Sequence, residues 1–370
     1  MRVTRIRQVA LVTALALFAA ACGGDEEADT DAPATEEEAA EEDEDEDADE
    51  GEAAAPEGED VSFIYVTPNP IGVNQFLELG QIGTERAAER LGGTARTFES
   101  TDLNSRRANI EAAVDDAPTV IVLTTFEFTE LAQEFAEANP DQSFILIDAC
   151  PETPAANLHC GVFREYEGTY LLGVMAGSLT ESGNIGSVVA LDIPFLSRFS
   201  DGFAMGAMAV NDAVNDSQVF IGGDNPFSDP ARAKEQALAL DAQGVDHMLA
   251  AGSGSNGGVF EAAAEQGFLA YGVDVNQCPD QPGVVVDNIL KRVDVVTETL
   301  IDRILDGTAE GFNSFGLAEE GVGVVALSDD LATSECVIAD YPEVITTVQE
   351  YHDLIVSGEL VIEDPMFAGS

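Results

Sequence analysis

From residue 61 onward, short apolar runs alternate with longer stretches in which apolar residues recur every third or fourth position. The short runs, rich in Val, Ile, Leu and Phe, are typical of strands, and the longer spacing is typical of amphipathic helices. In the first part of the chain the pattern predicts strands over 61–66, 94–98, 119–123 and 144–147, and helices over 74–91, 105–115 and 129–138. The run over 119–123 is almost wholly apolar, as expected of a strand that a parallel sheet buries on both faces.

After residue 163 the same alternation starts again. It predicts strands over 184–190, 218–222, 247–250 and 269–273, and helices over 166–179, 199–210, 231–243, 256–265 and 293–305. Such alternation builds doubly wound, mostly parallel sheets. We therefore predict an α/β fold of two such lobes, joined by a hinge around a central ligand cleft. We assign 61–162 plus 276–308 to the N-terminal lobe and 163–275 plus 309–370 to the C-terminal lobe.

The N-terminus has the pattern of an export signal. Three arginines precede a short apolar run, and three alanines lead into Cys22. A basic start, a short apolar core and small residues before a cleavage point mark a secretory signal, too short for a membrane span. A cysteine in that place is typical of a lipoprotein, with residues 1–22 as signal peptide and lipobox and Cys22 as the lipidated residue. Plain secretion with an incidental cysteine is the alternative.

Composition then separates a tether from a folded part. Residues 23–60 hold 21 acidic residues and no basic or aromatic one, so this segment is expected to be a disordered, extended acidic tether. Beyond it, residues 61–370 carry 49 acidic and 12 basic residues. This excess of negative charge argues against binding nucleic acid or an anionic membrane surface.

Four further cysteines are an even number, which outside the cytoplasm favours disulfides. Connectivity is not fixed by the sequence, but we expect the pairs Cys150–Cys160 and Cys278–Cys336. The competing interpretation is a metal site. No CxxC spacing supports it and the histidines are scattered, so no metal and no cofactor is predicted.

The segment 250–277 is the strongest local candidate for a site. A glycine- and serine-rich turn containing Gly252 and Ser253 leads into a predicted helix that starts at Asn256, and Asp274 follows the next predicted strand. Ligands of open α/β sheets bind beyond the carboxyl ends of strands, where such turns present N–H groups and polar side chains. An ordinary strand-to-helix connection would show the same local pattern, so the wider context must decide.

Several stretches, in order along the chain, together resemble one family. They are EYEGTYLLGVMAG over 165–177, RFSDGF over 198–203, DPARAKE over 229–235, the segment 251–263, GVD over 272–274 and KRVD over 291–294. This set resembles the basic membrane protein family of ABC-transporter solute-binding lipoproteins, which includes purine-nucleoside-binding lipoproteins. The resemblance implies a type I periplasmic-binding-protein fold, a nucleoside or nucleoside-like solute, and ABC permease subunits as partners.

The resemblance also implies site residues. An aromatic face stacks on a base, while an acid and a lysine hold the ribose hydroxyls, since hydrogen bonds to charged groups are strong. The matching positions, which form the expected ligand-binding set, are Asn74, Phe199, Gly252, Ser253, Asn256, Asp274 and Lys291. Structural alternatives are a helix cap for Asn74, a core position for Phe199 and a surface pair with Asp294 for Lys291.

One departure from the family pattern concerns the first loop. Val73 stands where the resemblance leads us to expect a stacking phenylalanine. One face of a base clamp is then missing unless Phe126 or Phe128, after the strand over 119–123, supplies it.

We therefore predict a monomeric solute-binding lipoprotein of an ABC importer, anchored by lipid to the outer side of the cell membrane. A sensor lipoprotein that presents its ligand to a receptor, and a binding protein for another small polar solute such as a sugar, are the alternatives. An enzyme in the same cleft is disfavoured because the sequence has no GxSxG, no HExxH and no convincing Cys–His pairing.

Overall fold

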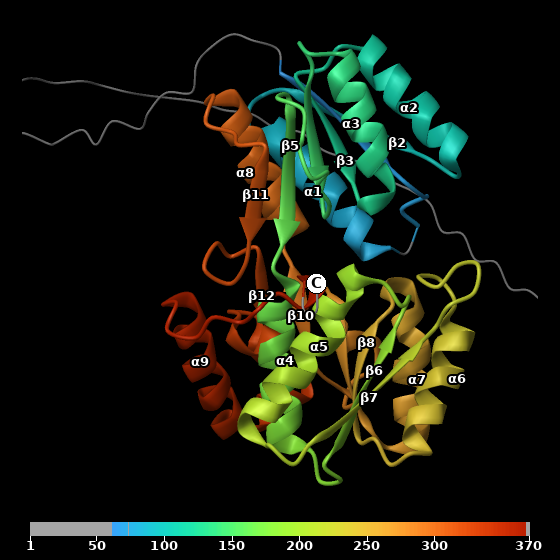
Figure 1. The fold of residues 1–370 in the computed structure, drawn as a ribbon, viewed down its shortest axis with the longest axis vertical. Coiled ribbons are helices and arrows are strands. Elements are labelled where there is room, and N and C mark those ends of the chain that lie inside the picture. Colours follow the sequence, from blue (N-terminus) through green and yellow to red (C-terminus); the bar gives the residue numbers. More distant parts are fainter. Residues whose placement is uncertain (1–60, 73, 368–370) are drawn as a thin grey trace, which may run out of the picture. The chain divides into compact units, whose positions relative to one another are not determined.

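The computed structural model describes residues 61–72 and 74–367, and the expected signal peptide, Cys22, the tether and Val73 lie outside this range. The N-terminal lobe is built on a parallel sheet in the order β11-β5-β4-β3-β1-β2 (Figure 1). Its strands are β1 (Ser62–Thr67), β2 (Thr94–Glu99), β3 (Val120–Thr124), β4 (Ser143–Ile147), β5 (Leu158–Phe163) and β11 (Phe312–Phe315).

Helices cover both faces of this sheet, which explains why its central strands are apolar throughout. The helices are α1 (Gln75–Arg90), α2 (Leu103–Asp115), α3 (Thr129–Ala138) and α8 (Val293–Leu305). In β1, Phe63 and Tyr65 join the core that α1 and α8 complete, while Ile64 and Val66 join the core under α2 and α3. Alternate side chains of a strand point to opposite faces, so a strand covered on both sides has no polar face.

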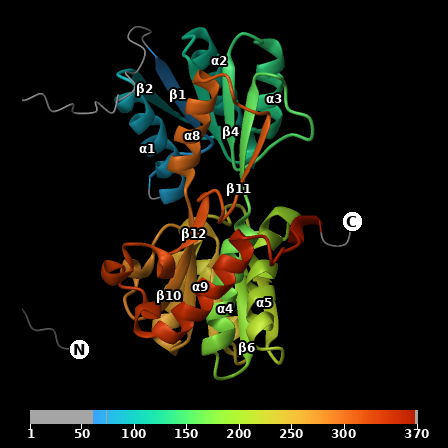
Figure 2. The same ribbon diagram turned by 90° about the vertical axis from the view of Figure 1, so that its left-hand side faces the viewer.

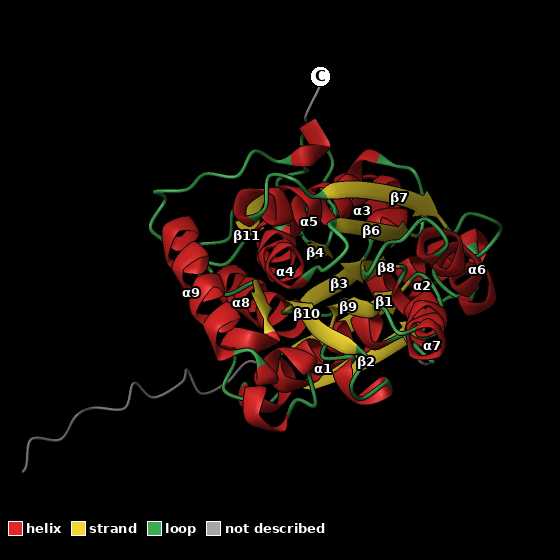
Figure 3. Ribbon diagram, turned by 90° about the horizontal axis from the view of Figure 1, so that it is seen from below, coloured by secondary structure: helices red, strands yellow, loops and turns green. Residues whose placement is uncertain are grey.

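The C-terminal lobe repeats this plan with one antiparallel edge strand. Its sheet has the order β12-β10-β9-β8-β6-β7, and only the β10–β12 pair among these strands is antiparallel. The strands are β6 (Asn184–Val189), β7 (Asn215–Phe220), β8 (His247–Ala251), β9 (Leu269–Asp274), β10 (Val285–Lys291) and β12 (Val322–Val324). The helices are α4 (Glu165–Leu179), α5 (Ser197–Val210), α6 (Pro230–Asp241), α7 (Asn256–Gln266) and α9 (Pro342–Val356). Figure 3 shows these helices on both sides of the strands.

The stretch 165–177, singled out in the sequence, forms most of α4 and packs tightly on α5. A β-carbon on Gly173 would lie 2.0 Å from the carbonyl oxygen of Phe203, and one on Gly206 would lie 1.9 Å from that of Tyr170. The two backbones approach so closely that no side chain fits between them. The motif therefore serves helix packing along most of its length.

The lobe boundaries differ from those expected. Strand β10 pairs with β9, so 285–291 belongs to the C-terminal sheet, although we assigned 276–308 to the N-terminal lobe. Strand β11 pairs with β5, so 312–315 belongs to the N-terminal sheet, against our assignment of 309–370. Helix α8 packs on α1 in the N-terminal lobe, as expected (Figure 2). Strand partners are long-range contacts, and local periodicity carries no information about them.

Both expected disulfides form: Cys150–Cys160, in the N-terminal lobe, and Cys278–Cys336, in the C-terminal lobe. Among the described residues, no helix is long and apolar enough to span a membrane.

Removing the Cys278–Cys336 bridge is expected to cost more stability than removing Cys150–Cys160. The first spans 58 residues of sequence and the second 10, and a cross-link that closes a longer loop removes more entropy from the unfolded chain. The loop-length relation gives about 4 kcal/mol and about 3 kcal/mol respectively. Urea unfolding of the two paired Cys→Ser variants would measure this, and the reverse order would contradict the expectation.

Candidate functional site

A cavity of about 110 Å³ lies between the two lobes, at the C-terminal ends of the strands of both sheets. The N-terminal lobe contributes Pro68, Asn69, Asn74, Phe76, Leu77, Thr125, Phe126, Glu127 and Asp148. The C-terminal lobe contributes Phe195, Leu196, Phe199, Phe227, Ala251, Ser253, Val273, Asp274 and Lys291. This is the place at which open α/β sheets bind ligands, because the loops leaving the strands converge there.

Four cavity residues have a positive φ angle, which residues other than glycine rarely adopt. Thr125, Asp148, Ser253 and Asp274 have φ values of 88°, 73°, 50° and 73°, and each lies at or just after the end of a strand. Such conformations cost on the order of 1–3 kcal/mol each and concentrate at functional sites. The case is clearest for Thr125, since its branched β-carbon makes positive φ especially unfavourable. All four residues line the cavity at the ends of their strands.

Lys291 is the charged centre of the site and joins the two lobes. It ends β10 in the C-terminal lobe, is only 2% exposed, and donates to Oδ1 of Asp148, in the N-terminal lobe, at 2.5 Å. Its Nζ also lies 3.1 Å from Oε1 of Glu165, the first residue of α4. Burial alone would lower the pKa of Lys291, but the carboxylates of Asp148 and Glu165 more than offset this and raise it. The lysine is therefore positively charged at neutral pH.

Aromatic rings enclose this ammonium group. The ring centroids of Phe76, Phe163, Phe195 and Phe199 lie 4.8, 4.9, 5.7 and 5.7 Å from its nitrogen. Each ring contributes a cation–π attraction and excludes water. Asp294, the alternative partner of Lys291, instead pairs with Arg86 at 2.6 Å.

Asp274 presents a carboxylate to the cavity without a protein partner. Among the described residues, nothing donates a hydrogen bond to its side chain, and Lys291 acts on it only through space. Burial raises the pKa of Asp274, and the positive charge of Lys291 opposes this rise. A partly buried, unsatisfied acceptor is costly unless a ligand supplies the missing donor.

The remaining predicted residues divide into two groups. Asn74, Phe126, Phe199 and Ser253 line the cavity. Asn74 is also the N-cap of α1, because its Oδ1 accepts from the N–H of Leu77 at 3.3 Å. Phe126 is 41% exposed, whereas Phe199 is nearly buried and turns toward Lys291. The ring of Phe126 is therefore more accessible to a flat ligand than the ring of Phe199.

Three expected ligand residues do not line the cavity. Phe128 is fully buried under α3 in the core of the N-terminal lobe, so it cannot supply the stacking face. Gly252 turns its N–H to Oδ1 of Asn256 at 2.8 Å, and Asn256 is itself buried. These two residues shape the turn that carries Ser253. Val73 lies outside the described residues.

Sequence reasoning missed Asp148, Glu165, Phe195 and Phe227. The two phenylalanines are partly exposed cavity residues on the loops after β6 and β7. A signal for Asp148 was available in the sequence, because Asp148 follows the fourth predicted strand of the first unit just as Asp274 follows the fourth predicted strand of the second. Asp148 is therefore the counterpart of Asp274, with the same φ of 73°. Among the described residues, no cluster of His, Cys, Asp and Glu is arranged to hold a metal ion.

Two parallel-sheet lobes around a cavity of this kind define the periplasmic-binding-protein class, and comparison with known proteins gives the family. The family described as ABC transporter substrate-binding protein PnrA-like matches residues 72–349, and the chain belongs to it. This confirms the family and the fold class expected from the sequence. The chain is an ABC transporter substrate-binding protein.

Relatives and solved structures agree with this assignment. An uncharacterized lipoprotein of Pyrococcus abyssi is 30% identical to this chain, and the match covers 67% of this chain and 64% of the length of the relative. Basic membrane protein A of Borreliella burgdorferi is 30% identical over 62% of this chain and 68% of its own. The crystal structure of an ABC transporter solute-binding protein from Aeropyrum pernix matches with a TM-score of 0.70 and 26% identity, covering 82% of this chain and 94% of its own.

Proposed function

We propose that this protein captures a nucleoside or nucleoside-like solute outside the cytoplasmic membrane and hands it to the permease of an ABC importer. The observation that carries the proposal is the unpaired Asp274 carboxylate in a cavity edged by aromatic rings. Neighbouring hydroxyls of a sugar can satisfy such a carboxylate, and a ring face gives a flat base its apolar contact.

Aromatic residues from both lobes line the cavity. Phe126 comes from the N-terminal lobe, whereas Phe195 and Phe227 come from the C-terminal lobe. A planar base held between the lobes would gain contact area from both sides. We therefore assign stacking to these residues, with Phe199 supporting Phe195 through an edge-to-face contact at a centroid distance of 6.3 Å.

The charged residues that line the cavity limit which solutes it can bind. Asp148, Asp274 and Glu127 line the cavity, and its one lining cation among the described residues, Lys291, is already held by Asp148 and Glu165. A phosphate group would meet the unpaired carboxylate of Asp274, which repels it in a site that excludes water. The site favours a neutral solute, so we expect nucleosides to bind and the corresponding nucleotides to be rejected.

A thermal-shift screen of the purified chain against nucleosides, free bases, pentoses, hexoses and nucleotides tests the proposal. A ligand that binds only the folded state adds about 2.7 kcal/mol of stability at a hundredfold excess over its dissociation constant. We expect a shift with nucleosides and none with their monophosphates. A shift with sugars alone would make this a sugar-binding protein, and a larger shift with nucleotides would contradict the charge argument.

Membrane attachment through Cys22 belongs to the same proposal. The signal-like pattern and lipoprotein relatives support it. Replacing Cys22 with serine is expected to move the protein from the membrane fraction to the soluble fraction after export, as fractionation would measure.

Whether the ligand is imported or presented to a receptor is tested by uptake of labelled solute in cells that lack the protein.

A further inference from the structure

A smaller cavity of about 30 Å³ adjoins the main one at Asp274. The two share Phe76, Ser253, Val273 and Asp274, and Gln277 lines only the smaller one, which we call the side pocket. A water-sized group needs about 10–15 Å³ of such a volume. The side pocket therefore has room for a substituent of two or three such groups.

The amide of Gln277 has an orientation that its surroundings dictate. Its Oε1 accepts from the backbone N–H of Val273 at 3.2 Å and from Nδ2 of Asn256 at 3.0 Å. A backbone N–H can only donate, so the amide oxygen must face Val273. The Nε2 group therefore points away from that N–H. Nε2 has no hydrogen-bond partner among the described residues, although Gln277 is only 9% exposed.

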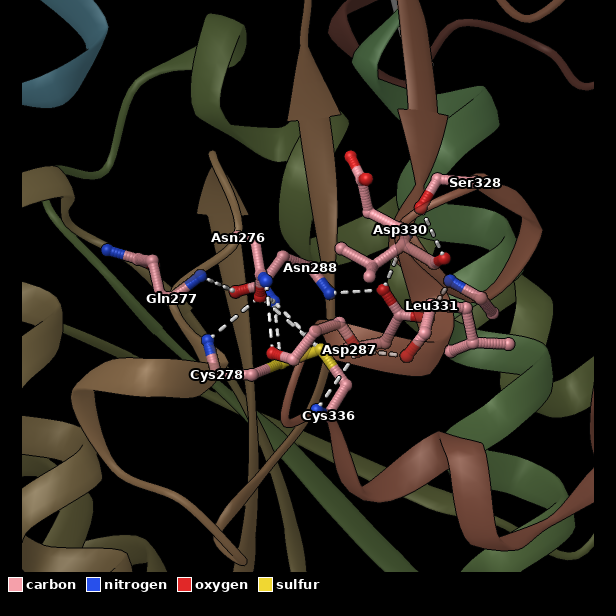
Figure 4. Close-up of a disulfide and its surroundings, with 12 residues drawn as sticks. Asn276, Gln277, Cys278, Asp287, Asn288, Ser328, Asp330, Leu331 and Cys336 are labelled. Carbon is pink, nitrogen blue, oxygen red and sulfur yellow. Dashed lines mark hydrogen bonds between the residues drawn. A yellow bond between two sulfur atoms is a disulfide. The ribbon is translucent and has the colours of Figure 1, made fainter.

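A chain of amides behind Gln277 holds it in place. The Oδ1 of Asn256 accepts from the N–H of Gly252, and the Oδ1 of Asn288 accepts from the N–H of Gln277 at 3.2 Å. Because both donors are backbone groups, both orientations are fixed. Asn288 Nδ2 in turn lies 3.1 Å from Sγ of Cys278. Figure 4 shows Asn276, Gln277 and Asn288 gathered around the Cys278–Cys336 disulfide.

The strand that carries Asp274 leaves space for these amides. A β-carbon on Gly272 would lie 2.0 Å from Oδ1 of Asn288 and 2.5 Å from Oε1 of Gln277. A glycine at this position lets the amides pack directly against β9. The donor of Gln277 and the acceptor of Asp274 are thereby held in one pocket.

We propose that the side pocket is a hydroxyl subsite, in which Gln277 Nε2 donates to a ligand hydroxyl that itself donates to Asp274. This inference rests on the proposed function, to which the contact between Asp274 and a sugar hydroxyl already belongs, and adds Gln277 as a second residue that binds the same hydroxyl. A hydroxyl both donates and accepts, which an unpaired amide N–H and an unpaired carboxylate together require. A methyl group or hydrogen in the same place would leave the buried donor unsatisfied, which costs affinity.

The test pairs ligand analogues with variants of the full chain. Calorimetry would compare adenosine with its 2′-deoxy, 3′-deoxy and 5′-deoxy counterparts on the wild type. We expect one of the three to bind about 100-fold more weakly, because it loses its hydrogen bonds to both Gln277 and Asp274. In Gln277→Met, which removes the amide without adding charge, and in Gln277→Glu, which replaces the donor with an acceptor, that difference should shrink about tenfold, because only the hydrogen bond to Asp274 is then left to lose.

Gln266→Glu is the matched control, because Gln266 is exposed at the end of α7 and lines neither cavity. It should keep the full discrimination between adenosine and the weak analogue. Equal binding of all analogues by the wild type, or undiminished discrimination in both Gln277 variants, would overturn the inference while leaving the proposed function intact. If no nucleoside shifts the melting temperature of the wild type, that result contradicts the proposed function itself, and with it the hydroxyl subsite.

Discussion

Replacing Lys291 with methionine is expected to lower the free energy of unfolding by about 3–5 kcal/mol at pH 7. The substitution keeps an unbranched apolar chain inside the aromatic rings, but it leaves Asp148 and Glu165 as buried carboxylates without their cation. Removing one partner of a buried ion pair is costly because the other charge stays desolvated. Urea unfolding of wild type and variant would measure the loss.

Lys234→Met is the matched control, since these are the two lysines of the chain. Lys234 pairs with Glu261 and Glu265 at the surface of α6 and α7, and exposed pairs contribute little. We expect almost no change in its unfolding midpoint. Similar midpoints for the two variants would mean that Lys291 is not the electrostatic centre of the site.

The loss in Lys291→Met should diminish in acid. Burial raises the pKa of Asp148 and of Glu165, and the lysine opposes both rises. Without it, both pKa values should rise further above their unfolded values, so protons bind more tightly to the folded variant and stabilise it as the pH falls. The difference from wild type should be largest near pH 7 and should shrink toward about pH 4. A constant difference would argue for a packing defect.

Asp274→Asn is expected to weaken nucleoside binding by about 10- to 150-fold, which corresponds to the 1.5–3 kcal/mol of a hydrogen bond to a charged group. The shape of the side chain is kept, and asparagine tolerates the φ of 73° better than most residues. Stability should be unchanged or slightly increased at pH 7, because burial raises the pKa of Asp274 and disfavours its charged form. Calorimetry and urea unfolding measure the two effects separately.

Asp280→Asn provides the comparison for this variant. It removes the same charge from an exposed position in the loop that follows Asp274, and it should bind like wild type. If Asp274→Asn also binds like wild type, the carboxylate does not contact the solute and the proposed orientation of the ligand is wrong.

Much of the site was accessible from the sequence because its residues sit at strand ends. Asp274 and Lys291 were identified through motifs, and Ser253 through the turn that precedes α7. Asn256 was expected to contact the ligand, but it is buried and does not line the cavity, since an asparagine at a glycine-rich turn can face the ligand or the backbone. Only its contacts with Gly252 and Gln277 decide between them.

The differences between these expectations and the structure share a physical cause. Phe126 and Phe128 are two positions apart in a short helical turn, so their side chains leave it in different directions. Phe128 is buried under α3, whereas Phe126 lines the cavity. The ion pairs of Lys291 with Asp148 and Glu165 were not expected, because these two partners are far away in the chain. Local periodicity does not report such contacts.

The sequence by itself determined the alternation of strands and helices, the expectation of disulfides, the family and the two-lobed fold class. These follow from burial patterns, cysteine number and ordered motifs, all of which are local or additive along the chain. The tertiary structure alone decided which lobe β10 and β11 join and which side chains converge on the cavity. It also showed that Lys291 links the lobes while Asp274 remains unpaired. These features depend on contacts between distant segments, whose geometry exists only after the two sheets have formed.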